Sequence, residues 1–200
     1  MATARGMPEV AVFAKAPIPG YAKTRLIPLL GPEGAAHVQA RLVGRAIATA
    51  QAAEIGPVSL WCAPDCSHPF FAGLGITRRL QPDGDLGARM LAAFEAAGGP
   101  LVLIGSDCPA LGPEDLRDAA AALACADVVI APAEDGGYGL IAARRPQAQL
   151  FADMPWSTAT VAERTRARAA TAGLVLHELR IIWDVDTAAD YERAARAGFL

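Results

Sequence analysis

The residues Glu9-Val-Ala-Val-Phe-Ala-Lys-Ala-Pro-Ile-Pro-Gly-Tyr-Ala-Lys-Thr-Arg-Leu26 combine a short apolar run with a proline-rich loop that ends in cations. The apolar run predicts a buried strand over Glu9–Ala14. In the loop two prolines restrict the backbone, and Gly20 lets backbone N–H groups come close to a ligand. Lys23 and Arg25 stand at its far end, where they could offset phosphate charge. The stretch therefore predicts a polyphosphate-binding loop at the end of a strand, although a proline-rich surface turn would have the same composition.

Strand and helix patterns alternate along the rest of the chain. Strands are predicted at residues 9–14, 58–62, 77–80, 101–104, 127–131, 138–142 and 174–179. Helices are predicted from Gly31-Pro32-Glu33, over 85–97, 113–124 and 157–170, and from Thr187. This alternation indicates a three-layer α/β/α fold with a mostly parallel sheet. Because no repeat or linker divides the sequence, we predict a single domain over residues 1–200.

Composition and charge narrow the class of protein. The 200 residues are 53% hydrophobic and 20% charged, and the net charge is −3, which argues against a general nucleic-acid surface. No apolar run reaches the roughly 20 residues that span a bilayer, and Met1–Pro8 has no signal-peptide core. We therefore expect a cytoplasmic protein without a membrane span. The four cysteines form no disulfide or metal framework, and the three histidines show no partner pattern.

Acidic residues follow three of the apolar runs. Asp107 comes after 101–104, Glu134 and Asp135 come after 127–131, and Asp184 and Asp186 follow a late apolar segment. Ligands bind beyond the carboxyl ends of parallel strands, and carboxylate oxygens suit Mg²⁺ or Mn²⁺ beside a diphosphate. These residues therefore predict a metal site in the same place as the phosphate loop.

Each carboxylate also has a purely structural interpretation. Asp107 could cap the approach to the next helix, and Asp186 could cap the last helix. Glu134-Asp135-Gly136-Gly137 could be no more than a hairpin turn. All three interpretations holding at once, beside a phosphate-like loop, is less probable than any one of them alone.

Two further segments contribute to the predicted site. Asp83–Arg89 is a glycine-rich turn into a helix that could pass close to a base or ribose. Met154-Pro155-Trp156-Ser157-Thr158 places an aromatic ring and two hydroxyls before a helix, where an anion or acceptor could dock. Trp156 could equally be a core aromatic side chain.

In this order, the motifs resemble a bacterial glycosyltransferase-like family of uncharacterised transferases, one branch of which is linked to arsenosugar biosynthesis. The resemblance covers residues 9 to 195 and rests on these motifs: Phe13-x-Lys15-x-Pro17-x-Pro19-Gly20-x-x-Lys23-Thr24-Arg25-Leu26, Gly84-Asp85-Leu86-Gly87-x-Arg89-Met90, Gly105-Ser106-Asp107-Cys108-Pro109, Pro132-x-Glu134-Asp135-Gly136-Gly137-Tyr138, Pro155-Trp156-Ser157-Thr158 and Asp184-Val185-Asp186-Thr187. It implies the GT-A fold of the nucleotide-diphospho-sugar transferases, a superfamily that also contains nucleotidyltransferases.

The resemblance also implies roles for individual residues. The nucleotide would be bound by the residues of two loops, namely Lys15, Gly20, Lys23, Thr24, Arg25, Gly84, Asp85, Gly87 and Arg89. Asp107 would bind the Mg²⁺ or Mn²⁺ ion, alone in the place of the D-x-D motif of many GT-A enzymes. Asp184 or Asp186 would supply a second metal contact.

The sequence leaves three functions open. The first is a metal-dependent glycosyltransferase that uses a nucleotide-diphosphate sugar and a small acceptor, with Asp135 or Glu134 as the acceptor-side base or orienting group and Asp107 as a catalytic metal ligand. The second is a guanylyltransferase-like nucleotidyltransferase that joins a nucleoside triphosphate to a phosphorylated small molecule. The third is a nucleotide-binding regulator without catalysis.

Overall fold

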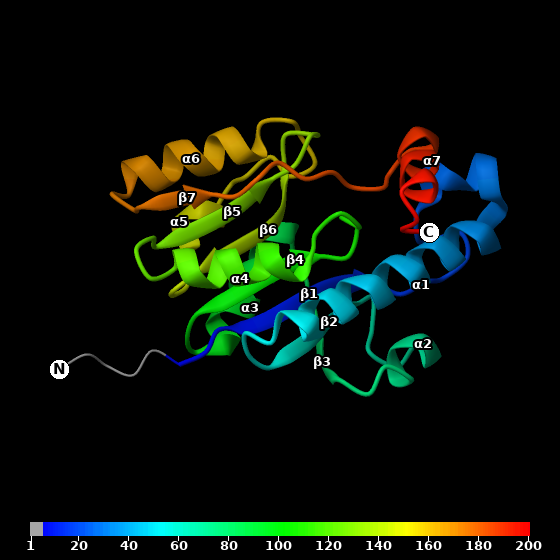
Figure 1. Ribbon diagram of the computed structural model, residues 1–200, viewed down its shortest axis with the longest axis horizontal. Helices are drawn as coiled ribbons and strands as arrows, with labels where there is room; N and C mark the ends of the chain where they lie inside the picture. The colour runs from blue at the N-terminus through cyan, green and yellow to red at the C-terminus, as the bar shows by residue number, and fades with distance from the viewer. Residues whose placement is uncertain (1–5) are drawn as a thin grey trace.

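The computed structural model describes residues 6–200, which form a seven-stranded sheet between two layers of helices (Figure 1). The strands, in chain order, are β1 (Glu9–Lys15), β2 (Val58–Ala63), β3 (Thr77–Leu80), β4 (Leu101–Gly105), β5 (Val128–Pro132), β6 (Tyr138–Ala143) and β7 (Leu176–Glu178). Their order across the sheet is β3-β2-β1-β4-β6-β5-β7. Only β6 runs antiparallel to its neighbours, β4 and β5. The predicted α/β class with a mostly parallel sheet is confirmed.

Helices cover both faces of the sheet. One face packs against α1 (Ile27–Ala53), α2 (Pro69–Ala72) and α4 (Pro113–Ala122), and the other against α3 (Leu86–Ala97), α5 (Ala148–Phe151) and α6 (Val161–Thr171). The 3₁₀ turn η1 (Thr24–Leu26), the start of α1 and α7 (Ala188–Arg196) share a third, smaller apolar cluster. This cluster places the end of the chain next to the loop that leaves β1 (Figure 1).

The central strands are apolar on both faces because both faces are covered. In β1, Val10 and Val12 belong to the core cluster on one side of the sheet, while Ala11 and Phe13 belong to the cluster on the other side. Packing on both faces therefore fixes the position of β1, and with it the start of the loop that follows its carboxyl end.

The hairpin interpretation of residues 134–137 is correct for the backbone. The turn joins β5 to β6, and the N–H of Ala133 donates to the carbonyl of Gly137 at 2.9 Å. Since a tight turn reverses the chain, β6 inserts antiparallel between β4 and β5.

Several predicted boundaries shift. The first helix begins at Ile27, four residues before the predicted start, but Gly31 breaks it with a φ of 69° and Pro32 opens its long part. The predicted helix at Ser157 begins only at Val161, because Ser157 has a φ of 64° that no helix accommodates. The short helices α2 and α5 were not predicted, because four residues are too few for a periodic pattern.

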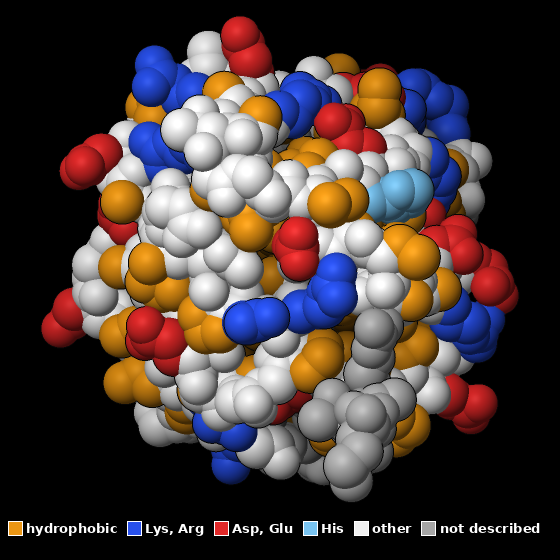
Figure 2. Space-filling view, turned by 90° about the vertical axis from the view of Figure 1, so that its left-hand side faces the viewer, with side chains coloured by type: hydrophobic (Ala, Val, Ile, Leu, Met, Phe, Trp, Pro, Cys, Tyr) orange, Lys and Arg blue, Asp and Glu red, His pale blue; other side chains and the backbone are white. Residues whose placement is uncertain are grey.

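The surface carries mixed charge. The face in Figure 2 shows Lys and Arg side chains interspersed with Asp and Glu over its described part. Among the helices of residues 6–200, none combines the length and the apolar character needed to cross a bilayer.

Candidate functional site

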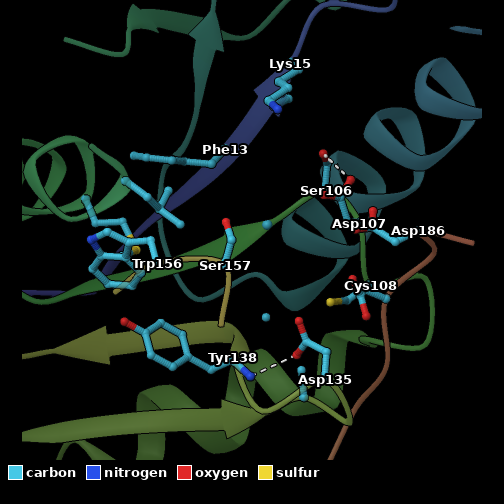
Figure 3. Close-up of a pocket in the computed structure, with 18 of the residues that line it drawn as sticks. Phe13, Lys15, Ser106, Asp107, Cys108, Asp135, Tyr138, Trp156, Ser157 and Asp186 are labelled. Atoms are coloured by element: carbon cyan, nitrogen blue, oxygen red, sulfur yellow. Dashed lines mark hydrogen bonds between the residues drawn. The ribbon is translucent and has the colours of Figure 1, made fainter. Parts of the chain in front are cut away.

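A cleft of about 730 Å³ opens beyond the carboxyl ends of β1 and β4. Figure 3 shows its layout, with Lys15 at the end of β1, carboxylates on one side and the aromatic side chains Phe13, Tyr138 and Trp156 on the other. The position agrees with the rule that α/β sheets bind ligands at this edge. The cleft therefore has a charged end and an aromatic end.

The charged end brings together most of the predicted site residues from four separate segments. The residues that line it are Lys15, Lys23, Thr24, Arg25, Asp107, Asp135, Asp184 and Asp186. The phosphate-like loop, the turn after β4, the β5–β6 hairpin and the segment before α7 thus meet in one cleft.

Lys23 is the centre of an ion-pair network in this charged end. Its Nζ lies 2.8 Å from Oδ1 of Asp107 and 3.2 Å from Oδ1 of Asp186, and its side chain is only 5% exposed. Arg25 contacts the other oxygen of Asp186 at 3.0 Å, but its side chain is 71% exposed. Burial acts to lower the pKa of Lys23, but the two carboxylates outweigh it and raise the pKa above its ordinary value. The ammonium therefore stays charged and joins three loops.

Asp184 shows that negative charge is in excess here. Burial, followed by the neighbouring Asp135, Asp186 and Asp107 carboxylates, raises the pKa of Asp184 to about 6. A cation placed among these carboxylates would relieve that repulsion. The oxygen donors fit a hard divalent ion such as Mg²⁺ or Mn²⁺.

The carboxylates do not form a ready-made three-ligand cage. Within residues 6–200, no three His, Cys, Asp or Glu side chains stand close enough together to hold a metal ion by themselves. Mg²⁺ usually takes one or two carboxylates and completes its shell with phosphate and water. The arrangement fits that second mode of binding.

The two acidic residues of the hairpin point in different directions. Asp135 lines the cleft, where its Oδ1 accepts a hydrogen bond of 2.9 Å from the N–H of Gly137 (Figure 3). Glu134 does not line the cleft and instead pairs with Arg193 of α7 at 2.7 and 3.0 Å. Arg193 also lies over the ring of Trp183, 4.2 Å from its centroid. Glu134 therefore ties the hairpin to the last helix.

Only some residues of the glycine-rich turn before α3 line the cleft. Gly84 and Arg89 line the cleft, and Nε of Arg89 donates to the carbonyl of Gly84 at 3.1 Å. Asp85, which the resemblance assigned to nucleotide binding, caps α3 by accepting from the N–H of Ala88 and does not line the cleft. Gly87 is buried against Trp156, outside the lining of the cleft.

Gly20 also lies outside the lining of the cleft. With a φ of 79°, it turns the loop that leads to Lys23. In this conformation Gly20 shapes the loop but does not itself contact the space of the cleft.

Two glutamines that no motif singled out also line the cleft. Gln39 of α1 is buried and donates to the carbonyl of Lys15 at 3.0 Å, while Gln81 donates to the carbonyl of Trp61 at 2.8 Å. For Gln39, the available signal was a polar residue within the apolar face of a helix. Gln81 follows a short edge strand and carries no such signal.

Comparison with known proteins gives one family match. A family described as "Uncharacterized protein conserved in bacteria (DUF2064)" matches residues 46–158. A search of the curated proteins found no match.

Solved structures give close and distant similarities. A protein of Desulfovibrio desulfuricans G20, provisionally described as a nucleotide-diphospho-sugar transferase, is 31% identical with a TM-score of 0.89, over 96% of this chain and 88% of its own. A CMP:2-keto-3-deoxy-manno-octonic acid synthetase complexed with CTP is 16% identical with a TM-score of 0.62, over 96% and 100% of the two chains. The manganese complex of Rv0371c from Mycobacterium tuberculosis H37Rv is 17% identical with a TM-score of 0.59, over 95% and 99%. At 16% and 17% identity, the last two similarities show a shared fold and nothing further.

Proposed function

Because this chain belongs to the bacterial protein family DUF2064, and because its fold is that of nucleotide-diphospho-sugar transferases, we propose that it is a transferase acting on nucleotide-linked sugars. Its reaction is the transfer of a glycosyl group from a nucleotide-diphosphate sugar to a small acceptor, with a divalent metal ion. One observation carries the proposal: buried and exposed cations face a group of carboxylates in one cleft at the carboxyl edge of the sheet.

The cations suit the leaving diphosphate. Lys15, Lys23 and Arg25 line the same end of the cleft, and charge-assisted hydrogen bonds to phosphate oxygens are among the strongest that side chains make. When the bond between the sugar and the diphosphate breaks, negative charge develops on the departing oxygen. Preorganised cations in a partly buried cleft stabilise that charge.

The carboxylates suit a metal ion beside the diphosphate. Asp107, with Asp184 or Asp186, would hold Mg²⁺ or Mn²⁺, which when bound neutralises charge on the phosphates. The manganese complex of a protein with the same fold supports this choice of ion. Asp107 also accepts from Lys23 at 2.8 Å, so it orients a phosphate-binding cation as well.

Asp135 is the proposed acceptor-side base or orienting group. Its carboxylate lines the cleft, and the hydrogen bond from Gly137 fixes one of its oxygens. An acceptor hydroxyl placed at the other oxygen could give up its proton there as it attacks the sugar. The ion pair of Glu134 with Arg193 makes Glu134 the weaker candidate.

Nucleotidyl transfer is the second candidate. The similarity of fold to a synthetase complexed with CTP favours it, and a loop that presents Lys15, Lys23 and Arg25 fits a triphosphate as well as a diphosphate. In that reaction the acceptor phosphate would attack the α-phosphorus and pyrophosphate would leave.

Binding measurements with a metal-site variant test the proposal. We expect one nucleotide sugar to raise the melting temperature with Mn²⁺, and Asp107→Asn to abolish the metal-dependent part of that rise, since a ligand stabilises the state that binds it. Asp118→Asn, on α4 outside the cleft, is the control. A response to nucleoside triphosphates alone, with pyrophosphate formed, would move the assignment to nucleotidyl transfer. Binding without turnover of any acceptor would indicate a regulator, and no response to any nucleotide would refute the proposal.

A further inference from the structure

Ser157 has an unusual backbone conformation for a residue that is not glycine. Its φ of 64° lies in the left-handed region, which is unfavourable for residues with a Cβ atom. Among the described residues, the other non-glycine positions of this kind are Lys23, Glu54 and Asp153. Of these, only Lys23 also lines the cleft. Strain of this kind persists where the surroundings enforce it.

Three contacts hold the turn that carries Ser157. Trp156 packs so closely on Gly87 of α3 that a Cβ atom there would lie 2.8 Å from the indole ring. Ala159 packs still more closely on Gly136 of the β5–β6 hairpin, whose carbonyl accepts from the N–H of Ala162. The hydroxyl of Thr158 donates to the carbonyl of Pro155 at 2.7 Å. The turn is therefore fixed from α3, from the hairpin and from within.

The Ser157 side chain makes no use of these contacts. Thr158 and Thr160 are hydrogen-bonded to each other at 3.1 Å, whereas the structure gives the Ser157 hydroxyl no partner among residues 6–200. Figure 3 shows this hydroxyl pointing into the cleft, between the aromatic end and the side of Asp107 and Asp135. A strained residue thus presents a free hydroxyl at the middle of a ligand-sized cavity.

The neighbouring surfaces indicate what that hydroxyl binds. The aromatic wall of the cleft, formed by Phe13, Tyr138 and Trp156, offers apolar ring surface, while the charged end suits a diphosphate. A sugar ring attached to that diphosphate has apolar C–H faces and hydroxyls around its edge, so it matches a site with aromatic rings and a few placed polar groups.

We propose that Ser157 is a specificity-determining residue, whose hydroxyl hydrogen-bonds the sugar ring of the nucleotide-sugar donor while the ring lies against the aromatic wall. This inference rests on the proposed function and adds the place of the sugar. It requires that Ser157 act on the sugar alone, without contributing to binding of the nucleotide diphosphate.

The test compares matched ligands by calorimetry in the presence of Mn²⁺. The probes are UDP with UDP-glucose, GDP with GDP-mannose, and ADP with ADP-glucose. For the pair that binds the wild-type protein, we expect Ser157→Gly to weaken the nucleotide sugar about fivefold, the size of one lost hydrogen bond. The affinity for the free diphosphate should change less than about twofold.

Stability provides an independent readout in the ligand-free protein. Because glycine adopts a φ of 64° without strain, Ser157→Gly should raise the melting temperature by about 2 °C even as it weakens sugar binding. Glu54→Gly is the matched control: its φ is 53°, it lies at the end of α1 outside the cleft, and it should stabilise without changing either affinity. Opposite effects on stability and sugar binding would distinguish a ligand contact from a purely structural residue.

The remaining outcomes overturn the inference. Equal losses for the diphosphate and the nucleotide sugar would make Ser157 a general determinant of the cleft, and unchanged affinities would exclude a sugar contact. If the wild-type protein still bound a nucleoside diphosphate and its nucleotide sugar, either outcome would refute the role of Ser157 but not the proposed function. If it bound no nucleotide at all, both would fail together.

Discussion

At the scale of single residues, Lys23 is the least exposed member of the ion-pair network in the cleft. Its ammonium lies between Asp107 and Asp186, and those two carboxylates are also proposed ligands of a metal ion. The same oxygens cannot serve both cations fully, so a metal ion that enters must weaken the contacts of Lys23. On phosphate binding, Lys23 would exchange a carboxylate for a phosphate oxygen.

Removing this ammonium should therefore favour metal binding. We expect Lys23→Met to bind Mn²⁺ alone about tenfold more tightly than the wild-type protein, because two carboxylates lose their competing cation. Nucleotide affinity should fall in the same variant. Titration with Mn²⁺, followed by the signal of the free ion in electron paramagnetic resonance, measures the change. Arg25→Met is the control, with a smaller expected effect because Arg25 is mostly exposed. Weaker Mn²⁺ binding by Lys23→Met would contradict this account.

Asp184 makes stability depend on pH. Its pKa is raised from 3.8 to about 6 by burial and by the nearby carboxylates, so the folded protein holds this proton more tightly than the unfolded chain. The stabilisation is complete below about pH 4 and is lost as the pH rises through 6.

The variant Asp184→Asn should thus raise the melting temperature at pH 8 by about 2 to 4 °C, after allowance for the partial exposure of the group. At pH 4 the two proteins should melt within about 1 °C of each other. Thermal unfolding monitored by circular dichroism across this range gives the comparison. A difference that stays constant with pH would show that Asp184 titrates normally.

At the scale of elements, the β5–β6 hairpin and the turn before α6 depend on each other. A Cβ atom on Gly136 would lie 2.1 Å from the carbonyl oxygen of Ala159, and the φ of Gly136 is 88°. The hairpin presents Asp135 and the turn presents Ser157, so this contact sets the distance between two proposed site residues.

Replacing this glycine should separate the two elements. We expect Gly136→Ala to destabilise the fold by about 2 to 4 kcal/mol, from a backbone clash together with an unfavourable φ. The control is Gly98→Ala, which has a φ of 63° but no atom within 4 Å of the added Cβ and should cost only about 1 kcal/mol. Urea unfolding of both variants measures the free energy that this contact contributes. Equal losses of unfolding free energy would mean that the hairpin can shift away from Ala159 without destabilising the fold.

At the scale of the whole molecule, the sheet carries one apolar cluster on each face, and the third cluster lies beyond it, between α1 and α7. Trp61 and Trp156 belong to the cluster on one face, and Trp183 belongs to the cluster between α1 and α7. Since the sheet and the long α1 connect these clusters, we propose that the chain unfolds as one domain.

Tryptophan fluorescence can test this unity. We expect Trp183→Phe, which reports from Trp61 and Trp156, and the double variant Trp61→Phe/Trp156→Phe, which reports from Trp183, each to unfold in urea in one transition. In each variant the fluorescence midpoint should match that from circular dichroism within about 0.2 M. An earlier fluorescence midpoint in the double variant would show that the region around α7 unfolds separately.

Much of the fold was predictable because its causes are local. The apolar runs of β1 and β4, the cap at Asp85 and the capping box of Thr187 with Asp190 all depend on residues within one or two turns. The strand order was not predictable, because the insertion of β6 between β4 and β5 depends on which strand edges remain free when the hairpin docks. The conformation of Ser157 also escaped prediction, since Gly87 and Gly136 enforce it from other elements.

The amino-acid sequence by itself determined the alternation of strands and helices, and hence the edge of the sheet where chemistry-bearing loops gather. It also determined that cations and carboxylates follow the strands, because hydropathy and turn chemistry are properties of short segments. Tertiary structure alone decided that Lys23 lies against Asp186, 163 residues away, that Glu134 turns towards Arg193 while Asp135 faces the cleft, and that Ser157 points into it. Such contacts depend on the packing of the completed sheet, which brings together side chains that share no local pattern.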